Sequence, residues 1–247
     1  MMRWRWRKEE PESARGTMLC IGHSHVTCVA NAAELVGIPL QALNFWTMPG
    51  AVSKCGDQFE LSDTLARQLE QHNGPVFSMI GGSAHGVLGL LVHPRRFDFV
   101  LPAQPTLPLD PTAELLPLAA VRSVLESLMV DYLALMAKIH TFCQGRLFQI
   151  EPPPPYANGQ RMMESIPWSM YPGMVHEISP AYFRYKLWRL HSQIVMDWCA
   201  QNDADFVPCP LESIDQQGFL REPYYGDSAH AGTAYGALVL EQMKRLA

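Results

Sequence analysis

Hydrophobic residues along the chain form two kinds of pattern, short unbroken runs and longer stretches with helical spacing. The short runs are typical of strands that are buried on both faces of a parallel sheet. They predict five strands, at Thr17–Ile21, Ile38–Trp46, Pro75–Ile80, Arg146–Ile150 and Asp205–Pro208.

In the longer stretches, apolar residues recur three and four positions apart, which places them on one face of a helix. Most of these stretches follow a predicted strand, so the chain predicts an α/β fold, a three-layer α/β/α sandwich around a parallel five-stranded sheet. The predicted helices are Val26–Val36, Leu61–Gln71, Leu118–Phe142, Ala181–Ala200 and Ala231–Leu246.

Two segments fall outside this alternation. The proline-containing stretch His93–Pro111 is expected to be an ordered excursion over the edge of the sheet. The loop Tyr156–Ile178 follows a run of four prolines and is rich in methionine and aromatic residues. A loop of this length has two interpretations, a lid over a pocket or a packed surface loop.

Residues 18–247 are expected to form one domain, because 247 residues with 48% hydrophobic content suffice for a single large α/β core. The first 17 residues alternate arginine and tryptophan without an apolar central region. They are expected to be a disordered tail, or sequence ahead of a true start at Met18, and not a secretory signal.

Charge and cysteine content narrow the class of partner. The net charge of −5 and the lack of a basic stripe argue against nucleic-acid binding. The six cysteines contain no CxxC pair, which predicts reduced thiols of a cytoplasmic protein and neither a zinc cluster nor a disulfide framework. We expect no stable insertion into a membrane.

Small polar residues and histidines gather in three places that the predicted sheet brings to its carboxyl edge, where open α/β sheets carry their chemistry. The first cluster follows the first strand, the second follows the third strand, and the third precedes the last helix. They are Gly22-His23-Ser24-His25, Gly81-Gly82-Ser83-Ala84-His85 and Asp227-Ser228-Ala229-His230.

A hydroxyl nucleophile needs a neutral imidazole to take its proton, and the imidazole needs an acceptor on its other nitrogen. Ser24, His230 and Asp227 supply these three roles. Two other interpretations remain. A serine after a strand commonly caps a helix, and an Asp-x-x-His turn commonly caps one too. The histidines His23, His25, His85 and His230 could instead converge on zinc, iron or copper.

These clusters, in this order, resemble the SGNH (GDSL-like) hydrolases, serine esterases and lipases with a flavodoxin-like sheet. The likeness runs from about residue 18 to the C-terminus and includes Ala231 to Gly236 after the last cluster. It implies that Ser24 is the nucleophile, His230 the general base and Asp227 its orienting carboxylate. The implied oxyanion hole uses the Ser24 amide, a loop glycine after the second strand, which is Gly50 or Gly56, and an asparagine where Ser83 stands.

The chain departs from this family pattern at two positions. His23 stands in place of the usual acidic residue, and Ser83 in place of the asparagine. Losing one oxyanion donor costs about 100- to 1,000-fold in turnover, unless the Ser83 hydroxyl or His85 replaces it. His23, His25, Gly82 and His85 are the expected supporting residues.

The sequence therefore predicts a serine hydrolase that acts on a small O-acyl or O-acetyl ester, for which an acylated saccharide is one candidate, or that transfers its acyl group, without a cofactor. The loop Met162–Met174 suits an apolar chain or a stacked sugar ring equally. The alternatives are a weakly active or inactive module that binds a saccharide or protein, and a histidine-rich metal-binding protein.

Overall fold

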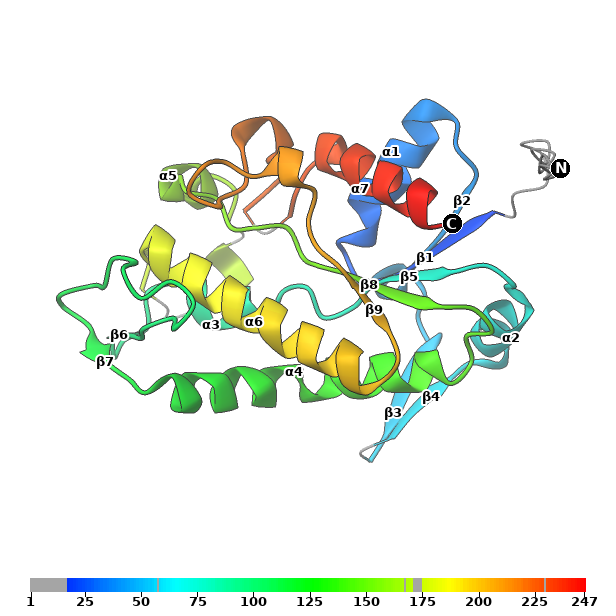
Figure 1. Ribbon diagram of the computed structural model, residues 1–247, viewed down its shortest axis with the longest axis horizontal. Helices are drawn as coiled ribbons and strands as arrows, with labels where there is room; N and C mark the ends of the chain where they lie inside the picture. Colours follow the sequence, from blue (N-terminus) through cyan, green and yellow to red (C-terminus); the bar gives the residue numbers. More distant parts are fainter. Residues whose placement is uncertain (1–16, 57, 167, 171–174, 229) are drawn as a thin grey trace, which may run out of the picture.

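The computed structural model describes residues 17–56, 58–166, 168–170, 175–228 and 230–247. At its centre lies a parallel five-stranded sheet in the order β2-β1-β5-β8-β9 (Figure 1). Counted along the chain this order is 2-1-3-4-5, the flavodoxin-like arrangement, so the predicted fold class is confirmed. The strands are β1 Met18–Gly22, β2 Leu40–Asn44, β5 Val76–Met79, β8 Leu147–Ile150 and β9 Asp205–Val207.

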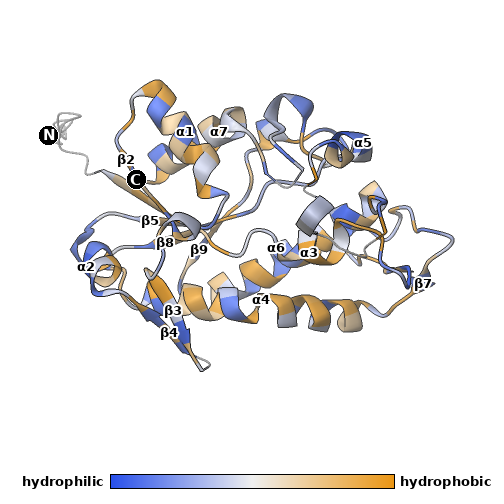
Figure 2. Cartoon of the chain, turned by 180° about the vertical axis from the view of Figure 1, so that it is seen from behind, coloured by the Kyte–Doolittle hydropathy of each residue, from blue (hydrophilic) through white to orange (hydrophobic). Residues whose placement is uncertain are grey.

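Helices cover both faces of this sheet, which gives the three layers. Helices α1 (Val26–Val36) and α7 (Thr233–Leu246) pack together on one face, and α4 (Leu118–His140) and α6 (Ala181–Gln201) lie on the other (Figure 1). The hydrophobic colouring along much of α4 is visible in Figure 2. Side chains of β1 alternate between the two cores: Leu19 and Ile21 belong to the α4 side, Met18 and Cys20 to the α1 side.

The segment after β2 differs from the prediction. The strand ends at Asn44, and the 3-10 helix η2 (Phe45–Thr47) follows, because the Asn44 side chain accepts a hydrogen bond from the Trp46 amide at 3.0 Å. Between the predicted strand Ile38–Trp46 and the predicted helix Leu61–Gln71, where the sequence indicates no element, the chain forms an antiparallel hairpin, β3 (Val52–Cys55) and β4 (Gln58–Leu61). Both strands are largely exposed, so they carry little of the hydrophobic pattern that predicts strands.

Two short helices complete this part of the molecule. Helix α2 (Asp63–Gln71) begins after Ser62, whose hydroxyl accepts a hydrogen bond from the Leu65 amide at 3.3 Å. Helix α3 (Ala84–Gly89), which the sequence did not predict, follows β5 directly. It therefore lies at the carboxyl edge of the sheet.

The excursion after His93 is ordered and packs against α6. It contains a short parallel pair, β6 (Phe97–Asp98) and β7 (Glu114–Leu115). The buried Asp98 carboxylate faces the buried ammonium group of Lys186 on α6, which also donates to the Pro108 carbonyl at 3.1 Å. A buried charge of this kind is tolerated only when paired and hydrogen-bonded, so the ion pair ties the excursion to the helix.

The described part of the loop 156–178 is mostly exposed and is anchored by three buried side chains. It contains α5 (Gly159–Met163) and η3 (Trp168–Met170), and its residues Tyr156, Met162 and Ile166 are buried. Residues 167 and 171–174 lie outside the described residues, so part of the predicted lid does too, as does the predicted N-terminal tail apart from Thr17. Closer to the C-terminus the chain forms the 3-10 helices η4 (Leu211–Ser213) and η5 (Glu222–Tyr224).

None of the described helices has both the length and the apolar character needed to cross a bilayer. The six cysteines are free thiols, of which four are buried.

Candidate active site

The turn from β1 to α1 depends on Gly22. Its φ of +153° is a conformation that other residues rarely adopt, and a Cβ atom there would lie 2.8 Å from the carbonyl carbon and oxygen of Met79 on the neighbouring strand β5. Only glycine fits this close approach. The chain therefore leaves the sheet immediately after β1 and carries Ser24 to its carboxyl edge.

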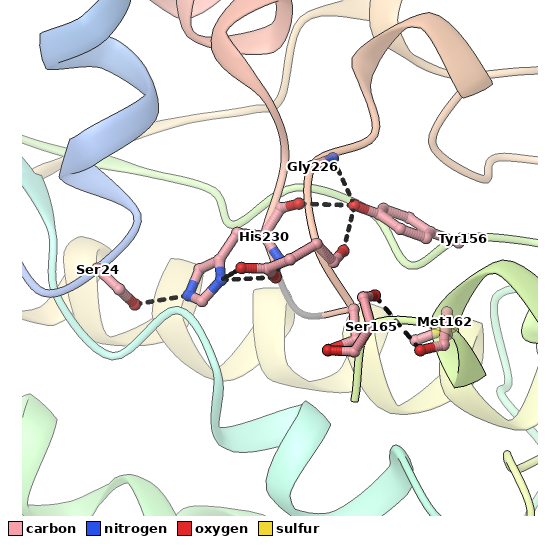
Figure 3. A network of polar contacts seen from close by, with 8 residues as sticks. Ser24, Tyr156, Met162, Ser165, Gly226 and His230 are labelled. Carbon is pink, nitrogen blue, oxygen red and sulfur yellow. Dashed lines mark hydrogen bonds and ion pairs between the residues drawn. The ribbon is translucent and has the colours of Figure 1, made fainter. Parts of the chain in front are cut away.

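The Ser24 hydroxyl is not used as a helix cap. The N-cap residue of α1 is His25, and no side chain makes the capping hydrogen bond. Instead, Ser24 Oγ lies 2.8 Å from Nε2 of His230, which is 206 positions further along the chain (Figure 3). The geometry favours the nucleophile interpretation over the capping interpretation for this residue.

Asp227 holds His230 by both ring and backbone. Its two carboxylate oxygens lie 2.8 and 2.9 Å from His230 Nδ1, and the His230 amide donates to one of them at 2.9 Å. Because an ionised carboxylate only accepts hydrogen bonds, the ring proton lies on Nδ1. Nε2 is then free of a proton and accepts the hydrogen bond of the Ser24 hydroxyl.

Ser24, Asp227 and His230 line one cavity of about 320 Å³, between the start of α1 and the segment that leads into α7. The Asp227 side chain is 56% exposed and that of His230 is 34% exposed. The three groups are therefore accessible to a small molecule. The arrangement can move a proton from a serine hydroxyl to an imidazole whose resulting charge faces a carboxylate.

Tyr156 organises the turn that carries Asp227 and His230, a role that the sequence did not indicate. Its hydroxyl accepts a hydrogen bond from the Gly226 amide at 2.8 Å and lies 2.7 and 2.6 Å from the carbonyl oxygens of Asp227 and His230 (Figure 3). With one proton to donate, it serves one carbonyl at a time. Burial raises the pKa of Tyr156 to about 12, so the hydroxyl keeps that proton at neutral pH.

The Tyr156 ring is fixed as well. It stacks on Tyr225 with centroids 3.7 Å apart and an angle of 9° between the planes. The buried guanidinium of Arg184 on α6 donates to the Tyr156 carbonyl at 2.6 Å and to the Ser179 carbonyl at 3.0 Å. Burial lowers the pKa of Arg184 to about 10, so it remains charged at neutral pH. The sequence did not indicate that Arg184, within a predicted helix, would hold the Tyr156 backbone.

Of the predicted supporting residues, His25 contacts the ring of His230, and Gly82 lies against His25. The His25 ring is buried, with its centroid 5.1 Å from that of His230. A Cβ atom on Gly82 would lie 2.8 Å from the His25 ring, so glycine makes room for it. Burial, and then the neighbouring His230, lower the pKa of His25 to about 3, so its ring is neutral and forms a wall of the site.

The other supporting histidines lie apart from this pair. His23 turns the other way, with its ring 5.5 Å from the rings of both Trp46 and Tyr132. His85 packs against His191 at 5.1 Å between ring centroids, and burial lowers its pKa well below the ordinary range. Neither residue has a hydrogen bond to Ser24 or His230 in the described part of the chain.

The residues expected to hold an oxyanion are less firmly arranged. Ser83 is exposed at the start of α3 and its hydroxyl makes no capping hydrogen bond. Gly50 lies in an exposed turn with φ of +77°, and Gly56 forms the turn of the β3–β4 hairpin. Gly50 is therefore the glycine that follows β2 and η2 directly.

An amide side chain does lie at this edge, on the strand next to β1. Asn44 is opposite Gly22 in the parallel register, and its Nδ2 donates to the Thr27 hydroxyl at 3.3 Å. The sequence did not single it out, because the resembling family has its asparagine after the third strand, where Ser83 stands.

Among the described residues, no group of three or more histidine, cysteine, aspartate or glutamate side chains is arranged to hold a metal ion. The histidines form pairs, His25 with His230 and His85 with His191.

No family model matches the chain, and no curated protein matches it. Among solved structures it is similar to phospholipase A1 from Streptomyces albidoflavus, at 13% identity over 95% of this chain and 100% of that chain, with a TM-score of 0.49. It is also similar to a GDSL-like lipase from Bacteroides thetaiotaomicron, at 10% identity over 92% and 87% of the two chains, with a TM-score of 0.40.

A third similar structure is a mutant of an acetyl-xylooligosaccharide esterase from Geobacillus stearmophilus, at 12% identity over 92% of each chain, with a TM-score of 0.41. All three proteins are named for the hydrolysis of esters. At TM-scores below 0.5 these similarities do not assign a substrate, and the case for function rests on the geometry of the site.

Proposed function

We propose that the protein is a serine ester hydrolase, with Ser24 as nucleophile, His230 as general base and Asp227 as the carboxylate that orients it. One observation carries the proposal: an unbroken chain of hydrogen bonds runs from the Asp227 carboxylate through both nitrogens of His230 to the Ser24 hydroxyl. The order carboxylate, imidazole and hydroxyl is the one that base-assisted attack by a serine needs.

In the first step Ser24 Oγ attacks the carbonyl carbon of the ester while its proton passes to His230 Nε2. The tetrahedral intermediate collapses as the C–O bond to the alcohol breaks, and His230 returns the proton to the departing oxygen. Water then gives a proton to His230 and attacks the acyl-enzyme. The second tetrahedral intermediate releases the carboxylic acid as its bond to Ser24 Oγ breaks, and His230 returns the proton to that oxygen. An alcohol that takes the place of this water makes the same site an acyltransferase. No step requires a cofactor.

The oxyanion of the tetrahedral intermediate needs hydrogen-bond donors aimed at it. We assign this task to the backbone amide of Ser24 together with the loops that carry Gly50 and Ser83. Because Ser83 offers a hydroxyl where the resembling family has an amide, the donor set is weaker, and we expect slow turnover.

The test is the hydrolysis of p-nitrophenyl acetate by the purified protein and by Ser24→Ala. We expect the wild type to release p-nitrophenol and the variant to lose that activity down to background, because Ser24 supplies the hydroxyl that lies within hydrogen-bond distance of His230 Nε2. Equal rates in the two proteins would refute the proposal.

A second candidate is a module that binds an acylated saccharide or a protein without turnover. The observation in its favour is Ser83, since a site that lacks a strong oxyanion donor can bind an ester and still fail to cleave it. Saturable binding of an acetylated oligosaccharide, with no hydrolysis by the wild type, would favour this candidate.

A further inference from the structure

A second cavity, of about 390 Å³, lies on the other side of the turn that carries Ser24. We call it the acyl cavity and define it by His23, Phe45, Trp46, Phe59, Leu128 and Tyr132. These side chains come from the β1–α1 turn, η2, the β3–β4 hairpin and α4. No residue of the triad lines this cavity, and the mechanism above does not use it.

The cavity begins one residue away from the nucleophile. Strands β1 and β2 are neighbours, with Gly22 opposite Asn44, and neighbouring strands lie about 4.8 Å apart. Phe45 and Trp46 therefore leave the sheet beside His23. The ring centroids of Phe45 and Trp46 are 5.8 and 5.5 Å from that of His23. His23, the residue before Ser24, lines the cavity.

The lining is mixed. Aromatic and aliphatic side chains make up more than half of its residues, and its two charged residues, Lys54 and Asp131, form an ion pair at 2.7 Å. Burial lowers the pKa of His23, so its ring is neutral at neutral pH. A hydrocarbon chain can lie against the aromatic and aliphatic side chains, and it needs no hydrogen bond from the polar ones, His23, Lys54, Asp131 and Tyr132.

Large apolar side chains of the cavity are exposed in the free protein. Trp46 is 70% exposed and Leu128 is 38% exposed. Exposed apolar groups that line a concave site mark places where a ligand removes them from water. The volume lies toward the lower end of the range of about 300–1,000 Å³ for small-molecule sites, which suits a chain of medium length.

We infer that the acyl cavity binds the unbranched, uncharged hydrocarbon chain of a medium-length acyl ester whose carbonyl group lies at Ser24. The alcohol part then leaves through the cavity that Asp227 and His230 line. This inference rests on the proposed function and adds the substrate class to it.

The first experiment measures kcat/KM for p-nitrophenyl acetate, octanoate and palmitate. Each methylene that leaves water for an apolar site raises kcat/KM by up to about fourfold. We expect octanoate to be preferred over acetate by at least tenfold, and palmitate to lose part of this gain because its chain exceeds the cavity. A profile that is flat, or highest for acetate, would overturn the inference.

Two variants locate the preference in the cavity. Trp46→Ala removes one wall, and Leu128→Trp fills the space from the surface of α4. In both, the ratio of kcat/KM for octanoate to that for acetate should fall at least tenfold. The matched control is Leu211→Ala, a 78% exposed leucine on η4, which should leave the ratio unchanged. An unchanged ratio in both cavity variants would contradict the inference.

The second experiment separates the cavity from the chemistry. Binding of sodium octanoate to Ser24→Ala is followed by tryptophan fluorescence, and the signal should be lost when Leu128→Trp is added. Binding without ester hydrolysis by the wild type would reject the proposed function and keep the cavity. Ser24-dependent hydrolysis of acetate without octanoate binding would keep the proposed function and reject the cavity.

Discussion

The candidate site has two halves, the hydrogen-bonded residues Ser24, His230 and Asp227 and the groups expected to bind the oxyanion. They differ in how firmly their side chains are held. In the half proposed to move the proton, Asp227 binds both the ring and the backbone of His230, and the Tyr156 hydroxyl binds the turn that carries them. In the half proposed to hold the oxyanion, Ser83 is exposed and its hydroxyl makes no capping hydrogen bond, and Gly50 lies in an exposed turn. The difference suggests that proton transfer is prepared in advance and that stabilisation of the oxyanion limits turnover.

The largest effect is expected from Asp227→Asn, which changes the hydrogen bond between residue 227 and His230 Nδ1. The asparagine amide can donate to His230 Nδ1, which moves the ring proton to Nε2, so the ring no longer accepts the Ser24 proton. We expect kcat for p-nitrophenyl acetate to fall on the order of 10⁴-fold. The control is Asp205→Asn, which removes a surface ion pair with Arg146 and should leave kcat within about twofold. A loss of less than tenfold in Asp227→Asn would mean that this hydrogen bond is not essential.

The weak half can be strengthened. Ser83→Asn restores the amide donor found in the resembling family, and we expect kcat to rise by about tenfold or more, up to the 100- to 1,000-fold typical of one donor. KM should change little, because the donor acts mainly on the transition state. Because Ser83 is exposed, the substitution creates no strain in the core. An unchanged or lower kcat would show that this position does not limit turnover.

A smaller effect is expected from Tyr156→Phe, which loosens the half proposed to move the proton without touching the triad side chains. The substitution removes the hydroxyl's hydrogen bonds to the Gly226 amide and to the Asp227 and His230 carbonyls, at a cost of about 1–3 kcal/mol. The hydrogen bond from the Gly226 amide to the His230 carbonyl, at 3.0 Å, remains. We expect kcat to fall about tenfold with KM nearly constant, measured together with the urea midpoint.

The matched control for that substitution is Tyr235→Phe. Tyr235 is also buried, but its hydroxyl has no hydrogen-bond partner among the described residues. The loss of its oxygen should change neither kcat nor stability appreciably. Equal effects in the two variants would remove the special role of Tyr156.

The smallest effect is the pH dependence of stability that two buried histidines, His25 and His191, contribute. Burial lowers the pKa of His25 to about 3 and that of His191 to about 4, below the value of about 6.5 in the unfolded chain. Their contribution to stability is complete above about pH 6.5. It falls as pH drops from there toward about pH 4, because only the unfolded chain binds the protons.

Each of these histidines should reduce the free energy of unfolding by about 1.4 kcal/mol per pH unit in that window. Urea unfolding at a series of pH values measures this slope. His191→Gln, which keeps a donor for the Gly81 carbonyl, should lower the slope by the share of one histidine. The same slope in the variant and the wild type would show that His191 is protonated in the folded state.

Much of this architecture follows from the sequence because it depends on local patterns. The unbroken apolar run around Leu19 gives a buried strand, and Gly22 marks its end. Since parallel strands end at the same edge, Ser24 and the turn of Asp227 and His230 were expected to meet there, and the structure brings them within hydrogen-bond distance.

The parts that sequence reasoning missed depend on contacts between distant residues or on weak patterns. The Tyr156 hydroxyl acts on residues 70 or more positions away, and no local pattern encodes that. The β3–β4 hairpin alternates too weakly, with most of its side chains exposed, to be separated from a loop. The sequence predicts Asn44 within the strand Ile38–Trp46, but in the structure it is the last residue of β2.

The central claim is that Ser24 is an activated nucleophile. A fluorophosphonate reagent reacts covalently only with a serine whose proton is taken by a neighbouring base, and the intact mass of the protein reports the product. We predict one label per chain, on the peptide that contains Ser24, with none in Ser24→Ala and a greatly slowed reaction in His230→Ala. Absence of labelling in the wild type, or labelling of Ser24→Ala at the same rate, would contradict the account.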